Sequence, residues 1–389
     1  MPYDVYLKKG EEKRILQGHS WVYANEVAHI DGKDKNGSLA NVFTNEGKFI
    51  GKGYINHLSK ILVRIFIRNE EEIDDDALIE SRIRRANDMR VSLGYDNCYR
   101  VVFAEADDLP ALIVDKYDDV LVMQCLSLGI ERNKQRIVNC LVKVFNPKGI
   151  YERSDVAVRA KEGLPECVGT LYGEVSDKIT ITENGIKMSV DVKNGQKTGY
   201  FLDQKENRFA IRRYCHGKSV LDCFCNSGGF SMNAALHAKD VLAVDISQRA
   251  IDNVNENAKL NGFSNVKTLC DDVFDALRRF KAEGNKFDVV ILDPPAFCKS
   301  LAEVKDAYRG YKDINVLGMK LVNHGGFLVS ASCSHYMTLP LFEKMLAQAS
   351  KESGRIVRTL EIKSQAIDHP SLLCAEETQY LKFFVMQVM

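Results

Sequence analysis

Two residues that follow apolar runs are of the types that covalent chemistry needs. Cys333 follows GGFLVSAS (325–332), and Asp293 follows FDVVIL (287–292). A thiolate is a strong nucleophile where its surroundings stabilise the negative charge. Most cysteines are buried and inert, but the motif around Asp293 favours a reactive thiol here. We therefore predict that Cys333 is a nucleophile and that Asp293 shares a cavity with it.

The chemistry that suits this pair is addition to a pyrimidine ring. C5 of a pyrimidine attacks a methyl group poorly, but a thiolate bonded to C6 makes C5 enamine-like. Asp293 would hold the N3 edge of the base, and Phe297 would stack on its face. Pro294 and Pro295 restrict the backbone between these two residues and so aim both side chains. A stacked base cannot meet a thiolate and a methyl donor together, so we expect a flipped base.

Other cysteines offer competing interpretations. Cys298 stands one residue after Phe297 and is the rival nucleophile, although the direction of its side chain is less certain. A zinc site built from the group Cys215, His216, Cys223 and Cys225 lacks the paired spacing of structural zinc sites. We therefore predict no metal.

A methyl donor needs a site of its own, and a turn with two adjacent glycines, DCFCNSGGF (222–230), provides one. It lacks the G-x-G-x-x-G of dinucleotide sites. Strand-end acids follow it in an order that suits adenosine without phosphates: Asp245 for the ribose and Asp272 for the adenine. This order predicts S-adenosylmethionine, bound by Phe224, Asn226, Ser227, Gly228, Asp245, Ile246, Asp272, Val273 and Asp293.

These residues need a scaffold, and the pattern of elements predicts an α/β fold in three domains. Residues 1–70 contain short strands separated by turns, typical of a β-barrel. Residues 71–182 mix strands with amphipathic helix, an α+β middle domain. Within 183–389, repeated strand–helix units predict a class I (Rossmann-like) methyltransferase domain, with ligands at the carboxyl ends of its strands.

Composition narrows the partners. Lys plus Arg and Asp plus Glu both number 53, so a basic patch for nucleic acid must be local. Residues 1–68 hold such a surplus, 11 basic against 7 acidic residues, which suits docking on phosphates. No apolar run is long enough to span a membrane. Eleven scattered cysteines favour a reducing, cytoplasmic location.

Several motifs together resemble the RlmI-type 23S ribosomal RNA cytosine-5 methyltransferases. They are NGQKTGYFLDQKENR (194–208), CFCNSGGF, AVDIS, DDVF, LDPPAF, YRGYKDIN, SCS (332–334) and DHP (368–370). The resemblance implies that Asp293 contacts the base and that Cys333 is the nucleophile. It also places Gln204 and Arg208 beside the methionine end of the cofactor.

The resemblance extends to the N-terminus, where KKGEEKRILQGHSWVYANEV is similar to a PUA RNA-binding domain. It implies that 23S ribosomal RNA is the partner, and it allows a homodimer. The basic residues expected to bind RNA are Lys8, Lys9, Lys13 and Arg14.

Three alternatives stay open. Related enzymes methylate N7 of guanine, which needs no cysteine. A cofactor-binding protein that binds the ribosome without catalysis would fit the same folds. A small-molecule methyltransferase is weaker, because it leaves the basic N-terminal barrel unexplained.

Overall fold

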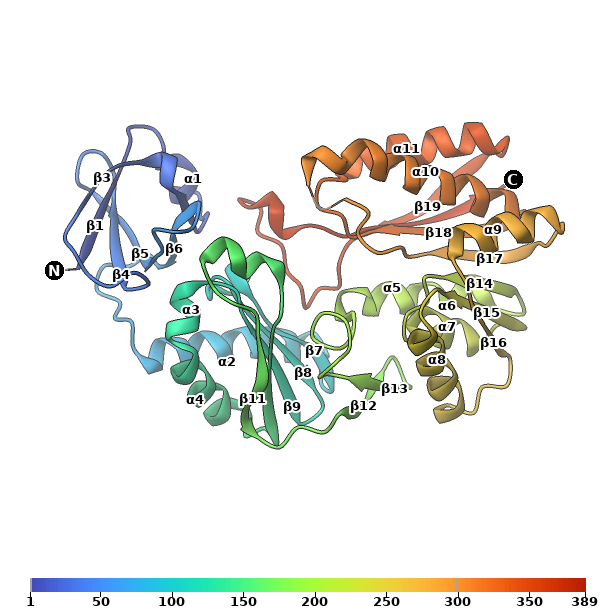
Figure 1. Ribbon diagram of the computed structural model, residues 1–389, viewed down its shortest axis with the longest axis horizontal. Helices are drawn as coiled ribbons and strands as arrows, with labels where there is room; N and C mark the ends of the chain where they lie inside the picture. The colour runs from blue at the N-terminus through green and yellow to red at the C-terminus, as the bar shows by residue number, and fades with distance from the viewer. Residues whose placement is uncertain (1, 299) are drawn as a thin grey trace. The chain divides into compact units, whose positions relative to one another are not determined.

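The computed structural model describes residues 2–298 and 300–389 and divides into two compact units (Figure 1). Unit 1 comprises the chain up to Ile179, Val190–Leu202 and Asp368–Thr378. Unit 2 comprises Thr180–Ser189, Asp203–Ile367 and Gln379–Met389. The chain therefore passes between the units several times, and the predicted boundary between residues 182 and 183 falls inside a strand.

The N-terminal part of unit 1 is a six-stranded sheet with the order β2-β6-β5-β4-β1-β3. Val5, Val42 and Ile65 lie in its core. Gly53 is required where β5 meets β6, because a Cβ there would lie 2.1 Å from the carbonyl oxygen of Arg64. The elements are β1 Tyr3–Leu7, α1 Lys13–Leu16, β2 Trp21–Tyr23, β3 Val27–Asp31, β4 Leu39–Phe43, β5 Phe49–Ile55 and β6 Ile61–Ile67.

The rest of unit 1 is built on a five-stranded sheet with the order β11-β10-β9-β8-β7. Asp75 caps its longest helix by accepting a hydrogen bond from Leu78 N, as short acidic side chains do at helix N-termini. The elements are α2 Asp76–Ser92, β7 Cys98–Phe103, β8 Leu112–Tyr117, β9 Val120–Cys125, α3 Leu128–Arg132, α4 Lys134–Phe145, β10 Gly149–Ser154 and β11 Cys167–Gly173. A break at Asn133 separates α3 from α4.

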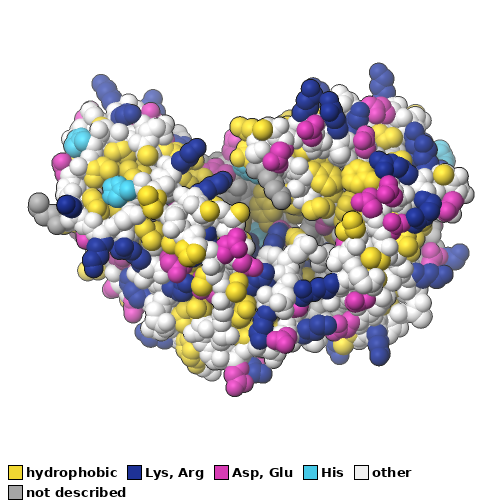
Figure 2. Space-filling view, viewed as in Figure 1, with side chains coloured by type: hydrophobic (Ala, Val, Ile, Leu, Met, Phe, Trp, Pro, Cys, Tyr) yellow, Lys and Arg dark blue, Asp and Glu magenta, His cyan; other side chains and the backbone are white. Residues whose placement is uncertain are grey.

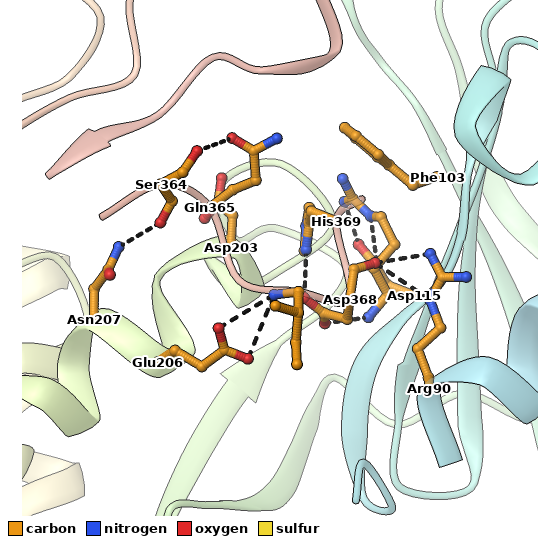
Figure 3. Close-up of polar contacts among 12 residues, drawn as sticks. Arg90, Phe103, Asp115, Asp203, Glu206, Asn207, Ser364, Gln365, Asp368 and His369 are labelled. Carbon is orange, nitrogen blue, oxygen red and sulfur yellow. Dashed lines mark hydrogen bonds and ion pairs between the residues drawn. The ribbon is translucent and has the colours of Figure 1, made fainter. Parts of the chain in front are cut away.

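Buried charges hold the segment Asp368–Thr378 within unit 1. Arg90 is fully buried and donates to both carboxylate oxygens of Asp107 and to the carbonyl oxygen of Asp368. Asp368 in turn accepts from Arg100 N and lies 2.6 Å from Nδ1 of His369 (Figure 3). A buried guanidinium needs such partners, so the DHP motif anchors this segment.

β12 (Lys178–Glu183) and β13 (Ile186–Asp191) form a hairpin, most of which belongs to unit 2. Its two turn residues, Asn184 and Gly185, have φ of 55° and 78°. Positive φ at both positions is the signature of the two-residue hairpin turns that Asn-Gly favours. An Asn-Gly turn of this kind therefore joins β12 to β13.

Unit 2 contains a seven-stranded sheet with the order β16-β15-β14-β17-β18-β20-β19. The first five strands are parallel, and β20 runs antiparallel to both of its neighbours. The strands are β14 Ser219–Cys223, β15 Asp240–Asp245, β16 Val266–Cys270, β17 Phe287–Leu292, β18 Val322–Ser332, β19 Val357–Lys363 and β20 Lys382–Val388.

Helices cover both faces of this sheet (Figure 1). Along β17, Val289 and Ile291 pack into one core cluster, and Val290 and Leu292 into the other. Strands buried on both faces read as continuous apolar runs, which is why FDVVIL does not alternate with polar residues. The helices are α5 Lys205–Ala210, α6 Arg212–Cys215, α7 Gly229–Ala235, α8 Gln248–Leu260, α9 Val273–Ala282, α10 Val304–Leu321 and α11 Leu339–Ser353.

Candidate active site

The carboxyl ends of four parallel strands in unit 2 meet at one edge of the sheet. Cys223 of β14 pairs with Val244 of β15 and with Leu292 of β17, and Leu292 pairs with Ser330 of β18. The glycine turn, Asp245, Asp293 and Cys333 all stand at or just after these ends. The structure therefore brings the predicted cofactor residues and the predicted chemical pair to one edge.

The glycine turn bends sharply between β14 and α7. Phe224, Asn226 and Gly228 have φ of 61°, 48° and 83°, the left-handed region that favours glycine and asparagine. A Cβ on Gly228 would lie 3.1 Å from Val254. Asn226 N donates to Asp245 Oδ2 over 3.0 Å, so the predicted ribose acid also fastens the turn.

The two predicted adenosine acids already carry structural hydrogen bonds. The second oxygen of Asp245 accepts from Ser247 N, and Ile246 beside it is 69% exposed. Asp272 Oδ1 accepts from the N–H groups of Phe274 and Asp275 and so caps α9. The ribose and adenine contacts of these carboxylates, and that of buried Val273, stay predictions.

Asp222 is a site residue to which sequence reasoning gave no role. It is 1% exposed; its Oδ2 accepts from Ser231 Oγ, and its Oδ1 has no partner in the described part of the chain. The pKa of Asp222 is raised to about 7, mainly by burial and also by the charges of Asp293 and Asp245. Asp222 could have been identified from the sequence, because it is an acid near the end of a strand just before the glycine turn.

The residues present fit S-adenosylmethionine. Three carboxylates, those of Asp222, Asp245 and Asp293, act on one another at this edge, and one buried oxygen lacks a donor. A ligand with a sulfonium and an ammonium group would neutralise this charge and could supply the donor. Ser227 lies in the same turn, where its carbonyl oxygen accepts from Asn257.

Gln204 contacts the predicted base-binding acid directly. Its Nε2 donates to Asp293 Oδ1 over 3.0 Å, and Asn207 Nδ2 donates to its Oε1 over 2.7 Å. The second bond decides which end of the amide faces Asp293. Arg208, which is expected at the same methionine end of the cofactor, makes a buried pair with Glu183 through two bonds of 2.6 Å. The methionine-end roles of both residues stay predictions.

Cys333 is half-buried just after β18, and a hydroxyl network holds the residues around it. Ser332 Oγ donates to Tyr311 Oη over 3.0 Å, and Tyr311 Oη lies 2.9 Å from Ser334 Oγ. Cys298, the rival, is 3% exposed, and its Sγ is directed at the carbonyl oxygen of Ser300. Burial raises the pKa of Cys298, which disfavours its thiolate form.

Phe297 lies in an aromatic cluster. Its ring centroid is 4.7 Å from that of Tyr311, 6.1 Å from Phe274 and 6.3 Å from Phe224. These contacts connect it to the glycine turn and to α9. Its predicted stacking on a base remains a prediction.

The predicted RNA-binding residues in unit 1 differ in availability. Lys8, Lys9 and Lys13 are exposed. Arg14 instead pairs with Glu26 over 2.9 Å and donates to the carbonyl oxygen of Trp21. Figure 2 shows basic and acidic side chains intermixed on the face drawn, as the balanced overall charge leads us to expect.

Within residues 2–298 and 300–389, one group has the spacing of metal ligands: Cys125, Glu131 and Glu152 in unit 1. Lys134 Nζ lies 2.6 Å from Glu131 and 2.9 Å from Glu152. A lysine therefore already provides the positive charge that these carboxylates need. The group Cys215, His216, Cys223 and Cys225 does not have that spacing in the described structure.

Within residues 2–298 and 300–389, no helix combines the length and the apolar character that crossing a membrane requires.

Comparisons with known proteins agree with this architecture. A family model for PUA-like domains matches residues 5–68, and one for S-adenosylmethionine-dependent methyltransferases matches residues 156–362. A solved structure from Streptococcus mutans, assigned as a SAM-dependent methyltransferase, has a TM-score of 0.84 at 21% identity and covers 100% of both chains. A methyltransferase complexed with SAH gives 0.85 at 20%, again over 100% of both chains. These two likenesses show the fold.

Relatives of higher identity show the family. A Vibrio cholerae protein named ribosomal RNA large subunit methyltransferase I is 43% identical, with 99% of each chain covered. A protein of the same name from Aeromonas hydrophila is 42% identical, with 100% of each chain covered. The resemblance drawn from the sequence motifs is confirmed. The chain belongs to the ribosomal RNA large subunit methyltransferase I family and is an S-adenosylmethionine-dependent methyltransferase.

Proposed function

We propose that this protein methylates C5 of a cytosine in 23S ribosomal RNA through a covalent bond between Cys333 and C6 of the base. The observation that carries the proposal is the pairing of β17 with β18, which sets Asp293 and Cys333 at the ends of adjacent parallel strands. The names of the relatives support ribosomal RNA as the substrate. Methylation of guanine N7 needs no cysteine nucleophile and so would give the Cys333 thiol no role in the reaction.

The residues divide the work in a definite order. Asp293, held by Gln204, binds the N3 edge of a flipped cytosine. The Cys333 thiolate forms a bond to C6, and the electron pair of the C5–C6 double bond makes C5 nucleophilic. S-adenosylmethionine supplies the methyl group that C5 takes. Loss of the C5 proton to a base then restores the double bond and expels the Cys333 thiolate.

Trapping the covalent adduct tests this proposal. RNA containing 5-fluorocytosine should stay bound to the wild-type protein, because fluorine cannot leave C5 as a proton. Cys333→Ala should abolish both the adduct and turnover, while calorimetry shows unchanged cofactor affinity. Cys298→Ala should keep most activity, and Cys270→Ala, which removes an exposed thiol, is the matched control.

Three outcomes would contradict the proposal. A trapped peptide that contains Cys298 rather than Cys333 would show that Cys298 is the nucleophile. An RNA that is methylated in its ordinary form but gives no adduct when fluorinated would remove the cytosine-5 mechanism and favour guanine N7. Methyl transfer missing under every condition would favour the non-catalytic RNA-binding alternative.

We also infer a cytoplasmic location, which the cysteines support: none forms a disulfide in the described residues. The homodimer stays a prediction that sedimentation equilibrium tests.

A further inference from the structure

Lys382 is a buried lysine that the mechanism above does not use. It begins β20 and is 7% exposed. Its Nζ donates to the carbonyl oxygens of Ser334 over 2.6 Å and Tyr380 over 2.7 Å. In the part of the chain that the structure describes, no carboxylate pairs with this ammonium group. Burying an ammonium without an opposite charge costs free energy, so its position needs an explanation.

The location of Lys382 provides that explanation. β20 runs antiparallel to β18, and Lys382 stands directly opposite Ser332. Its side chain then reaches the carbonyl oxygen of Ser334. The backbone of Lys382 and its side chain therefore hold the residues on either side of Cys333.

The ionisable groups that face Lys382 are thiols. The pKa of Lys382 is lowered to about 8, because burial lowers it more than the charges of Cys333 and Cys298 raise it. Tyr311 lies in the same network through Ser334, but burial raises its pKa to about 12, so it stays a neutral phenol. Cys298 is directed at Ser300. Cys333 is therefore the acid whose ionisation Lys382 is placed to control.

We propose that Lys382 is the positioning residue of the nucleophile: it fixes the backbone around Cys333, and its ammonium group stabilises the Cys333 thiolate. The thiol proton leaves to solvent, and the thiolate then forms an ion pair with the ammonium group that is already in place. When the thiolate leaves C6 at the end of the reaction, the same ammonium stabilises it again. This inference rests on the proposed function in that Cys333 is the nucleophile.

The reactivity of Cys333 as a function of pH tests the inference without RNA. Full-length wild type, Lys382→Met and Lys382→Arg are treated with iodoacetamide from pH 6 to 10, and the alkylated Cys333 peptide is quantified by mass spectrometry. Lys382→Met should raise the pH midpoint of Cys333 alkylation by about one pH unit. At pH 7 the alkylation should then be about tenfold slower than in wild type. Lys382→Arg should keep the reaction fast, because a guanidinium stays charged. The exposed Cys270, measured in the same samples, should not change.

A Cys333 midpoint that is the same in wild type and in Lys382→Met would overturn the inference. Cofactor affinity, measured by calorimetry, shows that each variant is folded. If Lys382→Met fails to bind cofactor, the Lys382→Arg variant provides the test by itself. A pH midpoint of Cys333 alkylation as high as that of an ordinary exposed thiol contradicts the inference. A midpoint at or below the wild-type value supports it. A shifted midpoint without a 5-fluorocytosine adduct would sink the proposed function but not the role of Lys382.

Discussion

The amide of Gln204 donates a hydrogen bond to Asp293 over 3.0 Å, although 89 positions separate the two residues in the chain. Asn207 holds the other end of that amide, over 2.7 Å. Asp293 is thus oriented by a residue that stands just before α5.

Gln204→Leu should lower kcat about 10- to 100-fold, since a hydrogen bond to a charged group contributes about 1.5–3 kcal/mol. Cofactor affinity should change by less than threefold if Gln204 acts on Asp293 alone. Single-turnover methylation and calorimetry measure the two quantities. Gln248→Leu, which removes an exposed amide bonded to Asp252, is the matched control. A loss confined to cofactor affinity would restore the methionine-end role of Gln204.

Asp245→Ala should weaken cofactor binding by about 1.5–3 kcal/mol, because a carboxylate that accepts hydroxyl bonds from a ribose is removed. The same change loses the bond from Asn226 N that holds the glycine turn. Calorimetry with S-adenosylhomocysteine measures the effect. Asp252→Ala on the exposed face of α8 should leave affinity unchanged. Unchanged affinity in Asp245→Ala itself would remove Asp245 from the site.

Asp222 should make the stability of the cofactor-free protein depend on pH. Its pKa is about 7 in the folded state and about 3.9 when unfolded. Between these values the folded protein holds a proton that the unfolded chain has lost. The stability that Asp222 contributes is therefore present at pH 4 and is lost as pH rises through 7, by up to about 1.4 kcal/mol per pH unit.

Comparison with Asp222→Asn isolates this effect. The variant should gain stability relative to wild type as pH rises from 5 to 7, and the difference should level off above pH 8. Urea unfolding at each pH measures it. Asp240→Asn is the control substitution, because Asp240 begins β15 and lies at the end of that strand away from the site. Parallel pH curves for wild type and Asp222→Asn would show that Asp222 does not titrate in this range.

The exposed lysines of the N-terminal sheet should bind phosphates. Replacing Lys8, Lys9 and Lys13 together by Ala should weaken RNA binding and reduce its salt slope by about 2, since each contact with single-stranded RNA contributes about 0.7. Filter binding at several salt concentrations measures the slope. A control with the same charge change replaces the exposed residues Lys259, Lys267 and Lys281 of unit 2. Equal salt slopes of RNA binding in the two triple variants would show that these lysines of the N-terminal sheet do not contact RNA phosphates.

The sequence by itself determined which residues stand at strand ends. Apolar runs such as FDVVIL indicate strands buried on both faces, and parallel strands end at one edge of their sheet. Asp245, Asp293 and Cys333 could therefore be predicted to share that edge, without knowledge of any side-chain direction. The cofactor followed from the order of acids and glycines along the chain, which needs no tertiary contact to be read.

Tertiary structure alone decided what each side chain contacts. Gln204 and Arg208 are four residues apart, yet one bonds Asp293 and the other Glu183, because packing against different segments sets their directions. Cys298 was the rival of Cys333 in the sequence, and only the tertiary structure shows that Cys298 is buried while Cys333 is half-buried. Lys382 reaches Ser334 only because β20 inserts antiparallel beside β18. Local propensity and periodicity describe one segment at a time, so they cannot say which distant strand becomes a neighbour.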